Sequence, residues 1–223
     1  MIRRLNVYEA VQERLKMVFD NFDYVYVSFS GGKDSGVLLN LCVEYIRRNL
    51  PGRKLGVLHM DYEVQYSQTT DYVRRRLADD SDVIEAYHCC VPFKVASCTS
   101  MYQSYWRPWE ESKREIWVRE MPEHCYTSKD FDFFNDELWD YDFQLLFAPW
   151  LKRRKHCRSV CCLVGIRTQE SFNRWRAIHS DKNYRRFGNY KWTHNIGGRL
   201  YNAYPIYDWK TSDIWVANGR VGG

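Results

Sequence analysis

The sequence predicts an α/β protein with an open, mostly parallel, twisted sheet and helices on both of its faces. Between residues 24 and 91, apolar runs of strand length alternate with stretches of helical period, in the order β-α-β-α-β. A continuous apolar run, Val160–Ile166, extends the sheet after an aromatic-rich insertion at about residues 92–150. The chain has 223 residues, 45% of them hydrophobic, which is enough for one domain with a core. We therefore expect a single domain over residues 1–223.

The elements of the first half are each predicted by a local pattern. Apolar residues on one face and Asn6 as N-cap predict a helix over residues 6–22. β-branched and aromatic residues predict a strand at Tyr24–Ser30, and helical period predicts a helix at Ser35–Asn49. The same reasoning predicts a buried strand at Lys54–Asp61, a helix at Ser67–Leu77 and a strand at Asp82–Val91.

The second half has weaker patterns. The insertion is dense in Trp, Tyr and Phe without a clean period, and we expect short helices at Trp109–Arg119 and Asn135–Trp139. Residues 167–177 are expected to be helical, and residues 180–204 to form a loop or short ribbon. Thr211–Ala217 opens a last helix. Because the sequence stops soon after that helix begins, we expect a truncated C-terminus.

Charge is spread unevenly around a net value of +5. Residues 108–142 carry 11 acidic and 4 basic side chains, whereas residues 151–200 carry 13 basic and 2 acidic ones. The basic block suggests an anionic ligand, either a polyphosphate nucleotide or a nucleic acid. The alternative is that the acidic segment packs against the basic one.

No apolar run reaches transmembrane length and no signal peptide is visible, so we expect a cytoplasmic protein without a membrane partner. In that compartment its eight cysteines would be reduced.

The stretch Ser30-Gly31-Gly32-Lys33-Asp34-Ser35 lies between a predicted strand and a predicted helix. Helix N-termini offer unpaired N–H groups and a partial positive charge, and glycine lets the backbone approach an anion closely. The lysine adds a cation, and the serines add hydroxyl donors. The loop therefore predicts a phosphate or sulfate site. It is not a Walker A motif, because the glycines are adjacent and an aspartate follows the lysine.

Two carboxylates near this loop leave alternatives open. Asp34 would repel a phosphate, so we expect it to face Mg²⁺, Lys33 or the amides of the loop. Asp61 closes the second strand and is expected to bind Mg²⁺ or a ribose hydroxyl, or else to cap the next segment. His59 reads as a packed core residue.

Three motifs carry a resemblance to known proteins. Ser-Gly-Gly-Lys-Asp-Ser resembles the PP-loop of the ATP pyrophosphatase superfamily, whose fold is described as adenine nucleotide alpha hydrolase-like. Residues 165–174, Gly-Ile-Arg-Thr-Gln-Glu-Ser-Phe-Asn-Arg, resemble the G-x-R-x-x-E-S-x-x-R stretch of its phosphoadenosine phosphosulfate (PAPS) reductase branch. Residues 204–215 resemble the P-I-x-x-W-x-x-x-D-I-W stretch that follows it there.

The resemblance implies a protein that binds ATP or PAPS with Mg²⁺ and cleaves or senses the bond between the α- and β-phosphates. It implies catalytic roles for Lys33, Asp34 and Arg167, and magnesium ligation by Asp34 and Asp61. The implied nucleotide-binding residues are Ser28, Ser30, Gly31, Gly32, Lys33, Asp34, Ser35, Asp61, Arg167, Glu170, Ser171 and Arg174. Arg167 and Arg174 could grip phosphate or sulfate, with Glu170 orienting one of them; the alternative is a surface helix with a Glu170–Arg174 charge pair.

The tryptophans of the insertion are similar to those of the IbrA-type PAPS reductase-like proteins, a family linked to prophage gene regulation. That resemblance implies a ParB-like (IbrB-type) partner protein.

Two features of the branch are missing from this sequence. It has no Glu-Cys-Gly-x-His tail, so the nucleophilic cysteine of a PAPS reductase is not visible. It has no Cys-x-x-Cys, and adjacent cysteines on a strand point to opposite faces, so we expect no iron–sulfur cluster. Three hypotheses remain: a PP-loop enzyme or nucleotide sensor, a sulfonucleotide reductase, and a nucleic-acid-binding module that uses residues 151–200 with Tyr184, Phe187, Tyr190 and Trp192.

Overall fold

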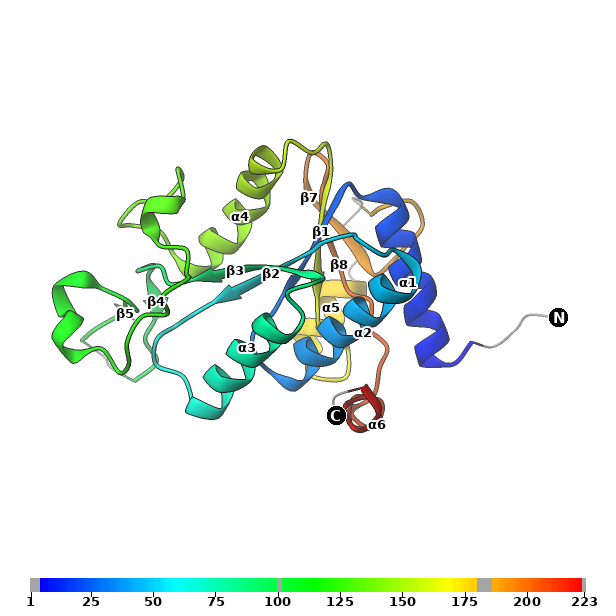
Figure 1. The fold of residues 1–223 in the computed structure, drawn as a ribbon, viewed down its shortest axis with the longest axis horizontal. Coiled ribbons are helices and arrows are strands. Elements are labelled where there is room, and N and C mark those ends of the chain that lie inside the picture. Colours follow the sequence, from blue (N-terminus) through cyan, green and yellow to red (C-terminus); the bar gives the residue numbers. More distant parts are fainter. Residues whose placement is uncertain (1–4, 100–101, 180–185, 222–223) are drawn as a thin grey trace.

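The computed structural model describes residues 5–99, 102–179 and 186–221. At its centre is a six-stranded sheet in the order β3-β2-β1-β6-β8-β7 (Figure 1). The strands are β1 (Tyr24–Ser28), β2 (Leu55–Met60), β3 (Ile84–Cys89), β6 (Val160–Val164), β7 (Thr193–Gly197) and β8 (Leu200–Ala203). All neighbours pair in parallel except β7 and β8, which form an antiparallel hairpin. The predicted fold class is therefore confirmed.

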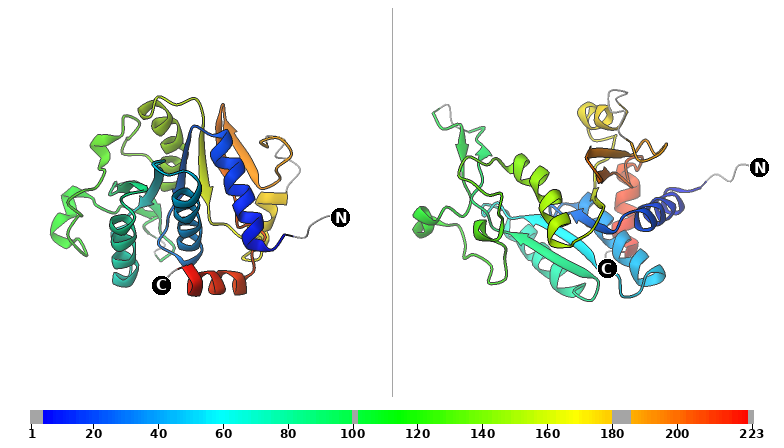
Figure 2. Two further views of the ribbon diagram at one scale, coloured as in Figure 1. Left: turned by 45° about the vertical axis from the view of Figure 1, so that its right-hand side comes forward. Right: turned by 90° about the horizontal axis from the view of Figure 1, so that it is seen from above.

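Helices cover both faces of the sheet. The helices are α1 (Val7–Asn21), α2 (Lys33–Asn49), α3 (Ser67–Asp79), α4 (Asp140–Arg154), α5 (Phe172–His179) and α6 (Thr211–Val221). One face packs against α1, α2 and α3, which stand side by side in the left view of Figure 2, with α6 crossing near their ends. The other face packs against α4 and the insertion, on the opposite side of the sheet from α2 and α3 (Figure 1).

The insertion forms an aromatic core rather than regular structure. Its short elements are β4 (Val95–Ala96), β5 (Tyr105–Trp106) and the 3₁₀ helices η1 (Glu111–Ile116) and η2 (Ser128–Asp130). Phe131 lies 4.9 Å from Phe143 and 4.8 Å from Trp150, measured between ring centroids, and Phe147 packs on Tyr87 of β3. The density of aromatic residues in this segment thus reflects burial against the second face of the sheet.

Several predicted boundaries were wrong. Trp109–Arg119 holds only the 3₁₀ helix η1, which is interrupted at Lys113, and Asn135–Trp139 is not helical but leads into α4. Helix α5 begins five residues later than predicted, at Phe172, because residues 167–171 are held in a loop by contacts described below. The ribbon expected within residues 180–204 is the β7–β8 hairpin, and Asn6 caps α1 through a capping box with Glu9.

None of the helices in the described part of the chain combines the length and hydropathy needed to cross a membrane.

Candidate nucleotide-binding site

Gly31 occupies a position that only glycine suits. It lies in the loop between β1 and α2 with φ +80°, a conformation that other residues rarely adopt. A Cβ atom there would lie 2.8 Å from Thr69 Cγ2 and 2.8 Å from Val73 Cγ2, two stiff β-branched side chains of α3. The loop is therefore packed closely against α3 at Gly31, and the next residue, Gly32, is exposed.

Ser30 and Ser35 stabilise the loop through hydrogen bonds between its two ends. The hydroxyls of Ser30 and Ser35 are 3.0 Å apart, Ser35 Oγ donates to the carbonyl of Gly32 at 3.0 Å, and Gly32 N–H donates to Ser30 Oγ at 3.3 Å. Gly32 is the N-cap of α2 and offers no side-chain cap to the N–H groups of the first turn. These N–H groups lie at the positive end of a 17-residue helix, which is a general arrangement for binding phosphate.

Lys33, Asp34 and Arg167 form a chain of charges at the start of α2. Lys33 Nζ lies 3.3 Å from Asp34 Oδ2, and the lysine side chain is 42% exposed. Arg167 is buried, with Nε 3.0 Å from Asp34 Oδ1, Nη2 3.4 Å from Oδ2 and Nη1 3.4 Å from Thr211 Oγ1. Asp34 therefore pairs with Lys33, one of the partners that the sequence suggests for it, and also with Arg167, which the sequence does not suggest as its partner. As arranged, the Arg167 guanidinium positions Asp34, and the exposed cation at the loop is Lys33.

Gly165, in the loop after β6, packs against the first turn of α2. A Cβ atom at this position would lie 3.1 Å from Asp34 C and from Ser35 N and Cα, all backbone atoms that cannot turn away. The loop after β6 therefore packs directly on the first turn of α2.

Gly165→Ala is accordingly expected to lower the free energy of unfolding by about 1–3 kcal/mol through overpacking. Chemical denaturation of the two proteins measures this difference. An unchanged stability would contradict the backbone contact.

The second motif forms an ion-pair network behind the loop. Glu170 accepts a hydrogen bond from Arg167 N–H at 3.3 Å, lies 3.6 Å from the Arg167 guanidinium, and also pairs with Arg174. Ser171 Oγ accepts a hydrogen bond from Arg174 N–H at 3.2 Å and so caps the start of α5. Glu170 thus contacts both Arg167 and Arg174. The Glu170–Arg174 charge pair, which the sequence offers as the alternative to phosphate binding, is present as well.

Ser28 and Asp61 lie apart from this network. Ser28 ends β1 and faces the α4 side, where it lines a cavity of about 280 Å³ together with Tyr141 and Asn202. Asp61 is 1% exposed, and its partners come from β3, the segment after β2 and the insertion: His88 Nε2 at 2.7 Å, Glu63 N–H at 2.8 Å and the Arg119 guanidinium.

Asp61 fulfils the capping role through its hydrogen bond with Glu63 N–H. Burial by itself would raise the pKa of Asp61, but the hydrogen bonds from His88 and Glu63 and the charge of Arg119 outweigh it and lower that pKa.

The arrangement does not favour magnesium at the predicted carboxylates. Mg²⁺ takes oxygen ligands in octahedral geometry and usually keeps several waters. Asp34 is already neutralised by Arg167, and the buried Asp61 by Arg119. Asp34 therefore does not fit a magnesium ion, and the remaining oxygen of Asp61, Oδ2, faces two imidazoles rather than the oxygen ligands that Mg²⁺ prefers.

Several residues that tie the insertion to the sheet were not predicted. Buried Glu63, with φ 63°, accepts hydrogen bonds from the N–H groups of Trp109 at 2.8 Å and Val118 at 3.0 Å. Trp109 Nε1 donates to the carbonyl of Asp61 at 2.8 Å, and Arg119 stacks over the Trp109 ring at 4.9 Å. The hydrogen bonds from Trp109 and Val118 to Asp61 and Glu63 join residues about 50 positions apart, and no local pattern in the sequence indicates them.

The cysteines follow the strand alternation that the sequence predicts. Cys161 belongs to the core under α1 and α2, whereas Cys162 belongs to the core under α4. Adjacent thiols on opposite faces of a sheet cannot ligate one cluster. The expected absence of an iron–sulfur cluster remains a prediction.

Comparison with known proteins adds family and fold. Residues 24–218 match the model of the phosphoadenosine phosphosulfate reductase domain. The chain is 39% identical over 215 residues to the uncharacterized protein YbdN of Escherichia coli K12, covering 95% of this chain and 51% of that protein. It thus spans about half the length of this curated relative.

Solved structures with low sequence identity share the fold. The U34-tRNA thiolase NcsA of Methanococcus maripaludis, solved with its [4Fe-4S] cluster, matches with a TM-score of 0.52 and 13% identity over 97% of this chain and 63% of that one. The FMN adenylyltransferase of Candida glabrata, solved with FMN and the ATP analogue AMPCPP, matches with a TM-score of 0.50 and 12% identity over 95% and 55%. At these identities the likeness concerns the fold.

Proposed function

Because the chain belongs to the phosphoadenosine phosphosulfate reductase domain family, we propose that it binds an adenine nucleotide, ATP in the first place, with the phosphates on the Ser30–Ser35 loop. The observation that carries this proposal is the loop itself. Gly31 adopts a left-handed conformation, Gly32 is exposed, and α2 begins directly after them without a side-chain cap. Lys33 adds a solvent-exposed cation to the N–H groups at the same place.

The reaction that this arrangement favours is cleavage between the α- and β-phosphates. Lys33 and the first-turn N–H groups would stabilise the negative charge that develops on departing pyrophosphate. Arg167 would act indirectly, because it holds Asp34 and thereby the first turn of α2. A protein that senses the nucleotide without cleaving it would use the same contacts. A magnesium ion accompanying the phosphates stays a prediction.

Lys33→Ala tests the assignment. A hydrogen bond to a charged group contributes about 1.5–3 kcal/mol, so we expect the variant to bind ATP about 10- to 100-fold more weakly with unchanged thermal stability. Titration calorimetry with ATP and with PAPS measures the affinities, and a pyrophosphate assay measures turnover. Lys54→Ala is a control, since Lys54 binds the carbonyls of Ser81 and Asp82 at the opposite end of β2. Equal ATP binding by Lys33→Ala and the native protein would refute the site.

The sulfonucleotide reaction is the second candidate, and the family match supports it. The printed sequence has no Glu-Cys-Gly-x-His motif to supply a nucleophile. Binding of PAPS at least tenfold tighter than ATP, with sulfite release in the presence of thioredoxin, would favour this candidate over the first.

The nucleic-acid hypothesis finds less support in the described residues. Trp192 is buried, and Phe187 packs on Phe22 and Tyr201, so neither ring is presented for stacking on bases. Tyr190 is 43% exposed, and Tyr184 lies outside the described residues. Arg153 of the basic block pairs with Asp132 of the acidic segment, in line with the intramolecular alternative. An IbrA-type role with a ParB-like partner likewise stays a proposal, which rests on the tryptophans of the insertion.

A further inference from the structure

Four metal-ligating side chains lie on one face of two neighbouring strands. His59 of β2 and His88 of β3 are directly opposite each other in the parallel register. Asp61 and Cys90 each follow two residues later, and residues two apart on an extended chain point to the same side. The intervening Cys89 belongs to the core under α4, so the four side chains point the other way, toward the α3 side. The sequence pattern is His-x-Asp beside His-x-Cys.

Three of these side chains already converge. One ligand atom each of His59, Asp61 and His88 lie within 4.8 Å of one another. His88 Nε2 is 2.7 Å from Asp61 Oδ2, and the two imidazole rings meet edge-on with centroids 5.2 Å apart. A metal ion bound at about 2 Å from each atom would replace the hydrogen bond between His88 and Asp61, with release of the His88 Nε2 proton to solvent, and would need only small shifts of these side chains.

The surrounding contacts orient the donors in the way that metal ligands are usually oriented. Nδ1 of His59 lies 2.8 Å from the carbonyl of Phe29 and must donate to it, so the lone pair is on Nε2. Oδ1 of Asp61 accepts hydrogen bonds from Glu63 N–H and Arg119, which leaves Oδ2 facing the histidines. Outer hydrogen bonds to a carbonyl and to a ligating carboxylate are typical of protein metal sites.

A fourth donor, the Cys90 thiol, lies nearby but outside the three atoms that already converge. Cys90 is buried directly after β3 and lies beside Cys125 of the insertion, close to the charge of Asp61. Imidazole and thiolate ligands suit Zn²⁺ and related transition metals, whereas Mg²⁺ prefers oxygen ligands alone. We propose that His59, Asp61, His88 and Cys90 form a tetrahedral site for Zn²⁺, a structural metal distinct from any ion carried by the nucleotide.

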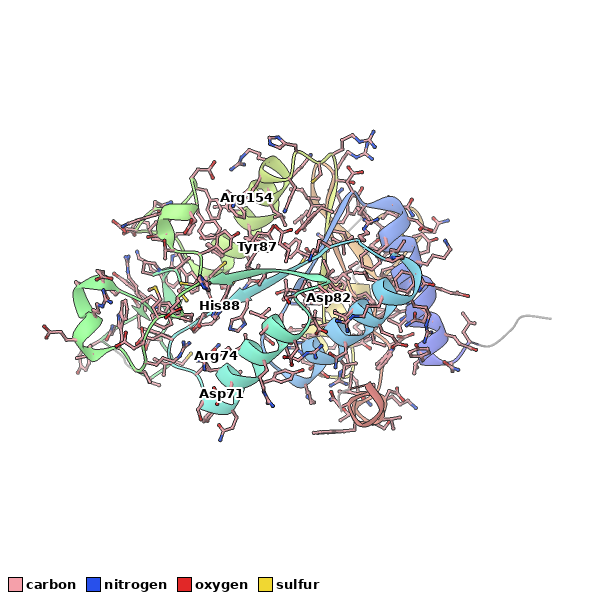
Figure 3. The ribbon with its side chains drawn as sticks, viewed as in Figure 1. Asp71, Arg74, Asp82, Tyr87, His88 and Arg154 are labelled. Atoms are coloured by element: carbon pink, nitrogen blue, oxygen red, sulfur yellow. The ribbon has the colours of Figure 1, made fainter. Side chains whose placement is uncertain are left out.

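The ion would join parts of the chain that are distant in sequence. It would link the ends of β2 and β3, and through the Cys90–Cys125 and Asp61–Arg119 contacts it would fix the insertion, beside which His88 lies in Figure 3. His59 would also connect the ion to Phe29, the residue before the Ser30–Ser35 loop. The proposal does not rest on nucleotide binding.

Metal content and a cobalt spectrum test the site. The full chain is stripped with EDTA under a phosphine reductant and then titrated with Zn²⁺ or Co²⁺. We expect one equivalent of either ion, and a cobalt complex with the intense visible bands of tetrahedral geometry and a near-ultraviolet thiolate band. Zinc at about 100-fold above its Kd should raise the Tm by about 5–10 °C.

Matched variants locate the ligands. Cys90→Ser should abolish the thiolate band and His88→Gln the stoichiometric binding, whereas Cys98→Ser and His156→Gln, which alter exposed residues, should change neither. Stripped native protein that takes up no stoichiometric zinc would overturn the proposal, and this measurement requires no variant to fold. Zinc binding that survives both Cys90→Ser and His88→Gln would overturn it as well.

Discussion

Replacing Arg167 by alanine is expected to lower the free energy of unfolding by about 3–5 kcal/mol, because it removes a buried guanidinium and leaves the half-buried Asp34 carboxylate with only the exposed Lys33 as its cation. The Arg167 side chain is 3% exposed and the Asp34 side chain 12%. The Arg167 guanidinium also bonds Thr211 of α6 and contacts Glu170, so its loss frees three parts of the chain. For a chain of this length the Tm should fall by about 6–20 °C, which differential scanning calorimetry measures.

The double variant Arg167→Ala/Asp34→Ala separates the ion pair from simple loss of packing. Removing both charged partners can be nearly neutral, whereas removing one leaves a desolvated charge. We therefore expect the double variant to recover part of the stability that Arg167→Ala loses. A double variant that is less stable than Arg167→Ala would show that Asp34 is not the partner that makes Arg167 necessary.

Gly31→Ala should reduce both stability and nucleotide binding. The left-handed conformation costs a residue with a Cβ about 1–2 kcal/mol, and the contacts at 2.8 Å with Thr69 and Val73 add an overpacking cost of about 1–3 kcal/mol. Any relief of that overlap moves the loop away from α3 and disturbs the phosphate site. Urea denaturation and ATP titration of the variant measure the two effects separately.

Gly52→Ala provides a matched control. Gly52 has φ +85°, and a Cβ atom there would meet nothing within 4 Å. This variant should therefore lose only the conformational part of the stability and keep native affinity for ATP. Equal losses of stability in the two variants would mean that the packing of Gly31 against α3 contributes nothing to stability. Equal affinities of the two variants for ATP would mean that the Ser30–Ser35 loop does not bind the nucleotide.

The sequence predicts the first half of the fold well because its signals are local. Alternating residues at Tyr24–Ser28, the glycine turn and the helical period after it all agree, and the structure places each element within a few residues. The same local agreement identifies the loop as an anion site. The PAPS reductase domain match over residues 24–218 bears out the family that the three motifs indicate.

The second half is predicted less well because its order comes from distant contacts. Helix α4 contains Pro149 and buries aromatic residues on a broad face, so its period is obscured. The acidic residues in its first turn and the basic ones in its last turn, which suit the helix dipole, are the signal that could have revealed it.

The sequence also does not predict the direction in which a side chain points. The motif identifies Arg167, but only the structure turns its guanidinium toward Asp34, 133 positions earlier in the chain. The His-x-Asp and His-x-Cys pairs are visible in the sequence, yet only the register of β2 against β3 brings them opposite each other.

A crystal structure of the protein with a non-hydrolysable ATP analogue tests the central claim most directly. The phosphates should lie against the backbone N–H groups of Gly32–Ser35 at the start of α2, within hydrogen-bond distance of Lys33 Nζ, with Arg167 still paired to Asp34. Phosphates bound elsewhere, with the Ser30–Ser35 loop free of the nucleotide, would contradict the claim.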